Sequence, residues 1–337
     1  MNDTQQAAPK ARPAALAGWL ARLVVGLVIV AVLVLWRGGD KTWRVLQAVP
    51  WPVWIGAVLF YWLGQVLSAW KWQYLLRARG ARLSLIECCR LYLVGMFWNL
   101  WMPTNIGGDA ARAYLAGPRC GGAASAAASI LVERLTGFLA LLAIGSIGLL
   151  ISVLQGAGGA QGIRVIVAAM AVLALFAGGA LAARAAAYRL TARSPHNKWL
   201  GKWASLHRAL DFYAQRERRA VLLTALALSL LFQSSQIALN IALARAVNLD
   251  LPGSTFWWLV PLLALASLVP LGIGGLGVRE AAAVGLLHNT GVAAGSVVAW
   301  SLLWQATVWL ASLPGIVGAR GVSHQNSSAA PPVEPDS

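Results

Sequence analysis

Two short stretches of the chain place charged residues beside glycine pairs in otherwise apolar sequence. "PTNIGGDAAR" (103–112) contains Asp109 and Arg112, and "PLGIGGLGVR" (270–279) repeats its Pro, Ile, Gly-Gly and Arg at the same spacing, ending on Arg279. A guanidinium group binds two oxygens of a phosphate or carboxylate at once. The chemistry that these residues fit is therefore the binding of an anionic group.

The glycines of the two stretches suit the same chemistry. Gly107 and Gly108 in the first stretch, and Gly274 and Gly275 in the second, permit a tight turn and a close approach of a ligand to the backbone. A helix that begins after each turn presents free N–H groups and its positive dipole end to an anion. We include Asn105 of the first turn in this candidate site.

A third polar element, "LVERLTG" (131–137), places Glu133 and Arg134 inside a long apolar run. The pair lies about eleven residues into that run, which at 1.5 Å per residue is about 16 Å. That depth is close to the midplane of a bilayer with a hydrocarbon core about 30 Å thick. Two roles for Glu133 fit this position: an ion pair with Arg112 or Arg279, or a direct part in binding substrate or moving a proton.

The acidic neighbours of the two arginines differ in their helical position. Asp109 lies three residues before Arg112, so the two side chains can pair across one helical turn. Glu280 directly follows Arg279 and therefore points to another side of the same helix. The full candidate site for binding an anionic substrate is Asn105, Gly107, Gly108, Asp109, Arg112, Glu133, Arg134, Gly274, Gly275, Arg279 and Glu280.

The composition assigns the chain to the integral membrane proteins. Of its 337 residues 59% are hydrophobic and only 11% are charged, whereas a soluble domain carries about a quarter charged residues. The net charge of +16 would suit nucleic acid. The basic residues stand in short loops beside apolar runs, however, which indicates membrane orientation and contact with anionic lipid heads. We therefore expect no nucleic-acid partner.

No arrangement of residues for a metal, a cofactor or catalysis stands out. The four histidines are scattered without paired ligand spacing, and no Asp-x-Asp occurs. Cys88, Cys89 and Cys120 fit no zinc spacing, and the adjacent pair is too cramped for an ordinary disulfide. We expect no metal, no cofactor and no enzymatic activity, and an enzyme that transfers glycosyl or acyl groups is the less favoured alternative.

Apolar runs long enough to span a bilayer define the elements that must position the charged residues. They are about 17–36, 51–76, 122–153, 163–187, 220–247 and 292–318. Two shorter runs, 84–102 and 256–270, each lead into one of the glycine turns. Tryptophans at the ends of runs, Trp70 and Trp72 among them, are expected at the membrane interface.

The basic loops constrain how these runs cross the membrane. Both 77–90 and 188–219 are rich in arginine and should be cytoplasmic. A full crossing by 84–102 would place 188–219 outside. A re-entrant hairpin that enters from the cytoplasm, turns at the glycines and returns removes this conflict, and a second hairpin then enters from the outside.

The predicted fold is an all-α polytopic membrane protein with about six full spans, two re-entrant helical hairpins and two inverted repeats. Each half has three crossings, so the second half, about 163–320, is upside down relative to the first, about 17–153. Inverted repeats with helices broken at the midplane are typical of transporters, and paired Gly/Pro interruptions indicate the binding site. Both termini are then cytoplasmic.

The ends of the chain and the longest basic loop complete the predicted domain organisation. Residues 1–16 and 321–337 are polar and are expected to be disordered. Trp36-Arg37, rather than small residues, follows the first apolar run, so we expect an uncleaved span within a membrane domain over 17–320. The loop 188–219 is expected to form an amphipathic surface helix held by anionic lipid heads.

Three segments together resemble a known family. "NLWMPTNIGGDAARAYLA", "ERLTGFLALL" and "PLGIGGLGVREAAA" are similar, in that order, to the lysylphosphatidylglycerol synthase transmembrane family, also called flippase-like. The resemblance covers about 15–320. It implies a membrane part that moves aminoacylated phosphatidylglycerol between leaflets, and other members are joined to, or encoded with, glycosyltransferases that act on polyprenyl-phosphate lipids. We expect only the membrane part here, without synthase activity.

The expected function is translocation of an anionic or phosphate-linked lipid or glycolipid between the leaflets of the bacterial cytoplasmic membrane. The lipid partner is a membrane phospholipid or a polyprenyl-phosphate-linked lipid. The alternative is a membrane scaffold or accessory subunit of a separately encoded glycosyltransferase or synthetase. The sequence contains no nucleotide-binding loop, so any coupling would be to an ion gradient or to the lipid's own concentration.

Overall fold

The computed structural model describes residues 13–37, 39–101, 107–155, 198–269 and 271–317, and the regular elements in these ranges are all helical. The predicted span 163–187, the start of the basic loop 188–219, Asn105 and most of both predicted tails lie outside the described residues.

The helices fall into two groups along the chain. The first group is α1 (Pro13–Arg37), α2 (Gly39–Gln47), α3 (Trp51–Ala78), α4 (Leu85–Trp101), α5 (Gly107–Ala116), the 3-10 turn η1 (Gly117–Arg119) and α6 (Ala123–Leu154). The second group is α8 (Lys198–Ala214), η2 (Arg216–Arg218), α9 (Arg219–Ala246), α10 (Gly253–Ala266), η3 (Ile273–Gly275), α11 (Val278–Leu287) and α12 (Ala294–Ser312).

Four helical segments in the described ranges are long and apolar enough to cross a membrane, namely Trp51–Ala78, Ala123–Leu154, Arg216–Ala246 and Ala294–Val317. They correspond to four of the six predicted spans, and such segments are typical of a polytopic helical membrane protein. In α1 the apolar stretch is the shorter Leu23–Leu35. Helices are the expected elements, because each backbone polar group in hydrocarbon must be bonded within its own segment.

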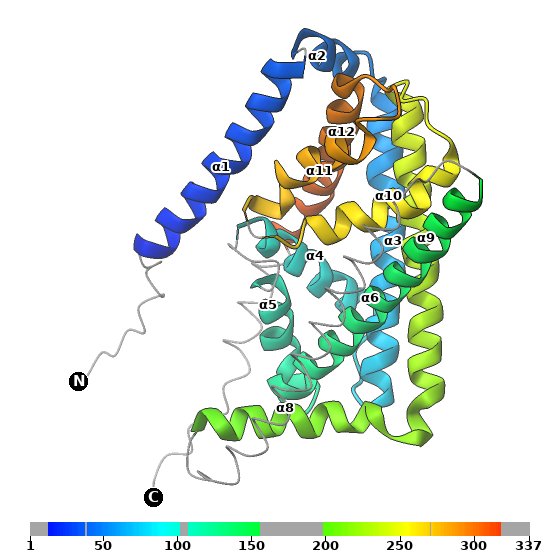
Figure 1. Cartoon of the computed structure of the whole chain (residues 1–337). Coiled ribbons are helices and arrows are strands. Elements are labelled where there is room, and N and C mark those ends of the chain that lie inside the picture. Colours follow the sequence, from blue (N-terminus) through cyan, green and yellow to red (C-terminus); the bar gives the residue numbers. More distant parts are fainter. Residues whose placement is uncertain (1–12, 38, 102–106, 156–197, 270, 318–337) are drawn as a thin grey trace, which may run out of the picture.

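The two glycine turns each join a pair of shorter helices. In Figure 1, α4 and α5 reach into the molecule from the end along which α8 lies, and α10 and α11 from the end at which α2 lies. Arg119, just after α5, pairs with Glu87 in the first turn of α4 at 3.0 Å, so both ends of the first pair lie together. The first pair reaches the second turn, since α4 contacts η3.

The same set of helix contacts occurs in both groups. The pair α4–α5 packs against α3 and α6, and the pair α10–α11 packs against α9 and α12. The short helix α2 packs on α12, as α8 packs on α6, and α3 packs along α9 in the middle. Each helix pair is thus held between the long helix that precedes it and the long helix that follows it.

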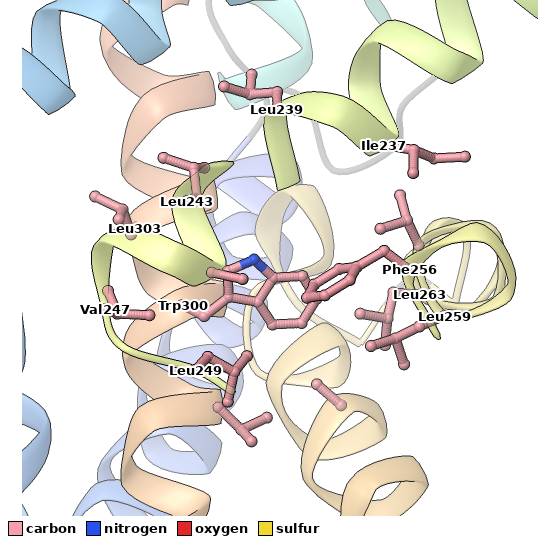
Figure 2. Packing of buried hydrophobic residues seen from close by; sticks show 14 of the residues in the cluster. Ile237, Leu239, Leu243, Val247, Leu249, Phe256, Leu259, Leu263, Trp300 and Leu303 are labelled. Carbon is pink, nitrogen blue, oxygen red and sulfur yellow. The ribbon is translucent and has the colours of Figure 1, made fainter. Parts of the chain in front are cut away.

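A large buried aromatic ring anchors the core of each group. Trp72 of α3 and Trp300 of α12 are both fully buried. Figure 2 shows Trp300 reaching toward Phe256 of α10, with leucines of α9 around them. The two rings meet edge to face with their centres 5.5 Å apart. The prediction that Trp72 lies at the membrane interface is wrong, because its indole packs between helices.

Candidate functional site

The arginine of the first stretch is buried among charged and aromatic side chains, although its Nε, like that of Arg279, has no hydrogen-bond partner among the described residues. Arg112 of α5 is only 3% exposed, and its Nη2 lies 2.8 Å from Oε2 of Glu133 on α6. Its Nη1 lies 3.5 Å from Oδ1 of Asp109. Its Cζ stands 4.2 Å from the ring centre of Trp72 and 4.0 Å from that of Tyr92. A buried carboxylate and two aromatic faces therefore compensate the charge of Arg112.

Glu133 accepts hydrogen bonds through both its carboxylate and its backbone oxygen. Besides Arg112, it accepts a hydrogen bond from the hydroxyl of Tyr92, which also lies 2.8 Å from Ser68 Oγ. The backbone oxygen of Glu133 accepts a hydrogen bond from Lys71 Nζ at 3.2 Å. Two roles were open for Glu133. The contacts show an ion pair, and its partner is Arg112 rather than Arg279.

Asp109 and Arg134 form the outer part of the same cluster. Arg134 donates from Nε and Nη2 to the two carboxylate oxygens of Asp109 at 2.8 and 3.0 Å. Asp109 is nearer to Arg134 than to Arg112, although it does pair with Arg112 as predicted. The structure thus brings together four of the predicted site residues: Asp109, Arg112, Glu133 and Arg134.

The arginine of the second stretch has very different surroundings. Arg279 of α11 is 4% exposed, and its Nη2 donates to Oδ1 of Asn240 on α9 at 3.1 Å. Its Cζ lies 5.0 Å from the ring centre of Trp304 and 5.7 Å from that of Trp300. Its Nε has no hydrogen-bond partner, and no carboxylate in the described part of the chain lies within 4.0 Å.

Glu280 is engaged elsewhere, as its position after Arg279 predicts. Its Oε2 accepts the N–H of Gly277 at 2.6 Å, and its Oε1 accepts the hydroxyl of Ser301 on α12 at 2.8 Å. The side chain is fully buried. Glu280 therefore caps the start of α11 and ties this helix to α12, rather than neutralising Arg279.

The two glycine pairs are required for different reasons. Gly108 donates its N–H to Asn99 Oδ1 at 2.8 Å, and a Cβ on it would lie 1.9 Å from the oxygen of Gly95. Gly274 and Gly275 have φ of +60° and +82°, which favour glycine. The first turn therefore needs close approach of α5 to α4, and the second needs a left-handed backbone. Gly107 begins α5.

Several polar residues at the centre of the molecule were not predicted from the sequence. Ser229, Gln233, Gln236 and Asn240 recur at helical spacing on one face of α9. Ser229 accepts a hydrogen bond from Lys71 at 3.0 Å near the first cluster, and Asn240 contacts Arg279 in the second. The spacing of polar residues in an apolar run was the signal that could have found this face.

Lys71 is the other residue that was missed. It is 3% exposed, although it stands between Trp70 and Trp72 near the basic end of α3. That neighbourhood is typical of an interfacial lysine, so no sequence pattern indicates that Lys71 belongs to the site.

An apolar cavity of about 460 Å³ lies between α1, α2, α3, α12 and Leu276 of the second glycine stretch. Gln305 and Trp309 of α12 line it, whereas Trp300 and Trp304 of the same helix flank Arg279. These positions fall on opposite sides of α12 at 3.6 residues per turn. The cavity therefore reaches the second glycine stretch at Leu276 but lies on the other side of α12 from the rings that flank Arg279.

The long apolar helices, with buried charges at the turns of two shorter helix pairs, define a multi-pass helical membrane protein. The model of the family described as the lysylphosphatidylglycerol synthase TM region matches residues 20–315. The chain therefore belongs to this family, as the three motifs predicted. No curated protein matches the chain.

Proposed function

We propose that this protein moves a lipid with an anionic or phosphate-linked head between the two leaflets of the bacterial cytoplasmic membrane. The observation that carries this proposal is the pair of buried arginines, Arg112 and Arg279, each in the short helix that follows a glycine turn. Arginine is expensive at bilayer depth and is usually retained there for a function. Membership of the family supports a lipid-related role in the membrane.

The arrangement of the helix pairs supports a path through the middle of the protein. The pairs α4–α5 and α10–α11 enter from opposite ends, and α4 contacts η3 of the second turn (Figure 1). Helix breaks at membrane depth are tolerated only against protein or a water-filled cavity. In the proposed topology these pairs are re-entrant hairpins in two inverted repeats with six full spans, and the recurring contacts of the two groups support it.

The polar face of α9 supports the same path. Ser229 lies at the first charged cluster and Asn240 at the second, and both are fully buried. A head group that crosses a bilayer must exchange water for other polar partners, because unpaired polar groups in hydrocarbon cost several kcal/mol. Side chains that are polar at successive turns of one helix offer such partners. No bond is made or broken in this function.

The orientation that we propose places α8 and both termini in the cytoplasm. The exposed arginines near α8, such as Arg208, Arg216 and Arg219, then face the cytoplasmic leaflet and its anionic lipids. Tyr213 fixes α8 to the end of α3 by donating its hydroxyl to the oxygen of Leu75 at 2.9 Å.

The test is reconstitution of the purified protein into liposomes. Fluorescent lipids in the inner leaflet are followed by their exposure to an impermeant quencher, for phosphatidylglycerol, a polyprenyl phosphate and the zwitterionic phosphatidylethanolamine. We expect protein-dependent movement of the anionic lipids and loss of it in Arg279→Ala and Arg112→Ala, with Arg245→Ala on the surface of α9 as the control. Absence of movement for every lipid, at confirmed incorporation, would favour the accessory-subunit alternative.

A further inference from the structure

The residues at corresponding positions around Arg112 and Arg279 differ in charge. The separation that relates Arg112 to Arg279 also relates Asp109 to Leu276 and Glu133 to Trp300. Both carboxylates that pair with Arg112 are therefore replaced by apolar side chains around Arg279. The structure agrees, since Trp300 lies beside the guanidinium of Arg279 with its ring centre 5.7 Å from Cζ.

Among the described residues, no carboxylate forms a salt bridge with Arg279. In the described part of the chain its one hydrogen bond is to the neutral amide of Asn240, and its Nε has no partner. Glu280, the nearest carboxylate in sequence, is occupied by Gly277 and Ser301. Burying a cation without an anion is strongly unfavourable, whereas a buried pair is tolerated. The surroundings of Arg279 are consequently complete only when an anion is bound.

The neighbours of Arg279 hold it in place for such a ligand. Asn240 is fixed by its own contacts, since its Nδ2 donates to the oxygen of Gln236 at 2.9 Å and its backbone oxygen accepts the indole N–H of Trp300 at 3.0 Å. The ring of Trp304 lies 5.0 Å from the Cζ of Arg279. A guanidinium held in this way loses little conformational freedom when its unpartnered edge binds oxygen atoms.

We propose that Arg279 binds the phosphate or phosphodiester group of the transported lipid, and that Arg112 supports the path by holding α5 against α6 through Glu133, without binding the head group. The inference rests on the proposed function and specifies it further, because it assigns head-group binding to the second helix pair alone. A free phosphate ion offers the same chemistry as a phosphodiester. The experiment therefore separates the two sources.

Binding is measured on the purified protein in detergent, so the readout does not depend on lipid movement. The probes are dioctanoyl phosphatidylglycerol, dioctanoylglycerol with the same chains but no phosphate, and inorganic phosphate. We expect the first to raise the thermal unfolding temperature of the wild type and the second to leave it unchanged. Stabilisation by inorganic phosphate alone, without any by phosphatidylglycerol, would overturn the assignment to a lipid.

The variants distinguish the two arginines by effects of opposite sign. Arg279→Gln should weaken binding of phosphatidylglycerol by about tenfold or more, since a hydrogen bond to a charged group is lost. It should leave the ligand-free protein as stable as the wild type or more stable. Arg112→Gln should destabilise the ligand-free protein, because Glu133 loses its partner, yet the folded fraction should keep the ligand-induced shift.

Two further variants complete the design. Arg279→Lys keeps the positive charge but cannot bind two oxygens at once as a guanidinium does, so it should retain part of the ligand-induced rise in unfolding temperature. Arg245→Gln removes an arginine from the surface of α9 and should bind as the wild type does. An undiminished shift in Arg279→Gln, or loss of the shift in Arg112→Gln instead, would overturn the inference. Binding that depends on Arg279 in a protein that moves no lipid would overturn only the proposed function.

Discussion

At the scale of single residues, the stability of the cluster around Arg112 depends on the pairing of its buried charges. Arg112 and Glu133 are 3% and 4% exposed and lie 2.8 Å apart. Such a pair adds little net stability over apolar residues of the same volume, but removing one partner is costly because the other charge stays buried. Replacing both members should therefore cost the folded protein much less stability than replacing one of them.

Glu133→Leu and Arg112→Met are each expected to destabilise the protein by about 3–5 kcal/mol, because each leaves the other charge of the pair uncompensated. The double variant Arg112→Met with Glu133→Leu should recover most of this loss. The measurement is the unfolding temperature in detergent, analysed as a double-mutant cycle. If the two single effects simply added in the double variant, the ion pair would not be what holds these side chains in place.

Cys120 offers a residue-scale prediction that depends on pH. Its side chain is 7% exposed in the loop after η1. Burial raises the pKa of the Cys120 thiol to about 11. Since the thiolate is the reactive form, and a raised pKa leaves the thiol protonated at neutral pH, maleimide should react slowly at pH 7. In a variant with Cys120 as its one cysteine, the rate should still rise about tenfold per pH unit from pH 7 to 9. A plateau near pH 8.5 would contradict this.

The charged site residues could be predicted from the sequence only where they interrupt an apolar run. Arg112, Glu133 and Arg279 do so, and the structure finds all three buried. Lys71 lies close to other basic residues, so nothing in the sequence separates it from an interfacial anchor. Asn240 is one of several polar residues at helical spacing in α9, but its contact with Arg279 depends on tertiary packing that local patterns do not specify.

At the scale of elements, the glycine turns control how closely the paired helices approach. A Cβ on Gly108 would lie 1.9 Å from the backbone oxygen of Gly95, and one on Gly275 would lie 2.7 Å from Cβ of Ser267. Backbone atoms cannot move aside as a flexible side chain does. The gap between α4 and α5 is therefore set by the absence of a side chain.

Gly108→Ala and Gly275→Ala are both expected to lower the unfolding temperature and to reduce lipid movement. The first forces α5 away from α4, and the second also places alanine at φ +82°. The matched control is Gly56→Ala in α3, where nothing lies within 4 Å of the new Cβ. There alanine should stabilise the helix by about 1 kcal/mol. Wild-type stability of Gly108→Ala would show that this close contact is not maintained in the membrane.

The sequence predicts where the short helices lie along the chain, but it does not predict which residues of neighbouring helices they contact. The runs 84–102 and 256–270 correspond to α4, Leu85–Trp101, and α10, Gly253–Ala266. Apolar runs and glycine breaks are local signals, and they place the ends of α4 to within one residue, whereas α10 begins three residues before its predicted run and ends four residues before the end of that run. Which face of α9 meets Arg279 depends on the packing of several helices at once.

At the scale of the whole molecule, the direction of each helix pair decides the architecture. A pair that re-enters has both of its flanking loops on one side of the membrane. Two full crossings would also return the chain to that side, but they would expose the intervening turn on the other face. The loops and the turn must therefore be probed together, and the arginines near α8 predict which side is cytoplasmic.

Single cysteines in a background without Cys88, Cys89 and Cys120 test this topology in intact cells. Arg82→Cys and Ala123→Cys flank the first helix pair, and Asp250→Cys and Asn289→Cys flank the second; all four positions are exposed. We expect an impermeant maleimide to label the second two from outside, and the first two only after permeabilisation.

The accessibility of the first glycine turn distinguishes a re-entrant hairpin from two full crossings. A cysteine at Asp109, three residues into α5, lies deep in the membrane in the re-entrant arrangement. Because this position is 16% exposed, a small permeant methanethiosulfonate should reach it slowly through the path, whereas a bulky maleimide should not react from either side. In two full crossings the turn would stand in external water, and the same maleimide would label it from outside as fast as it labels position 250. That result would replace the hairpin by two spans and remove the first arginine cluster from the middle of the membrane.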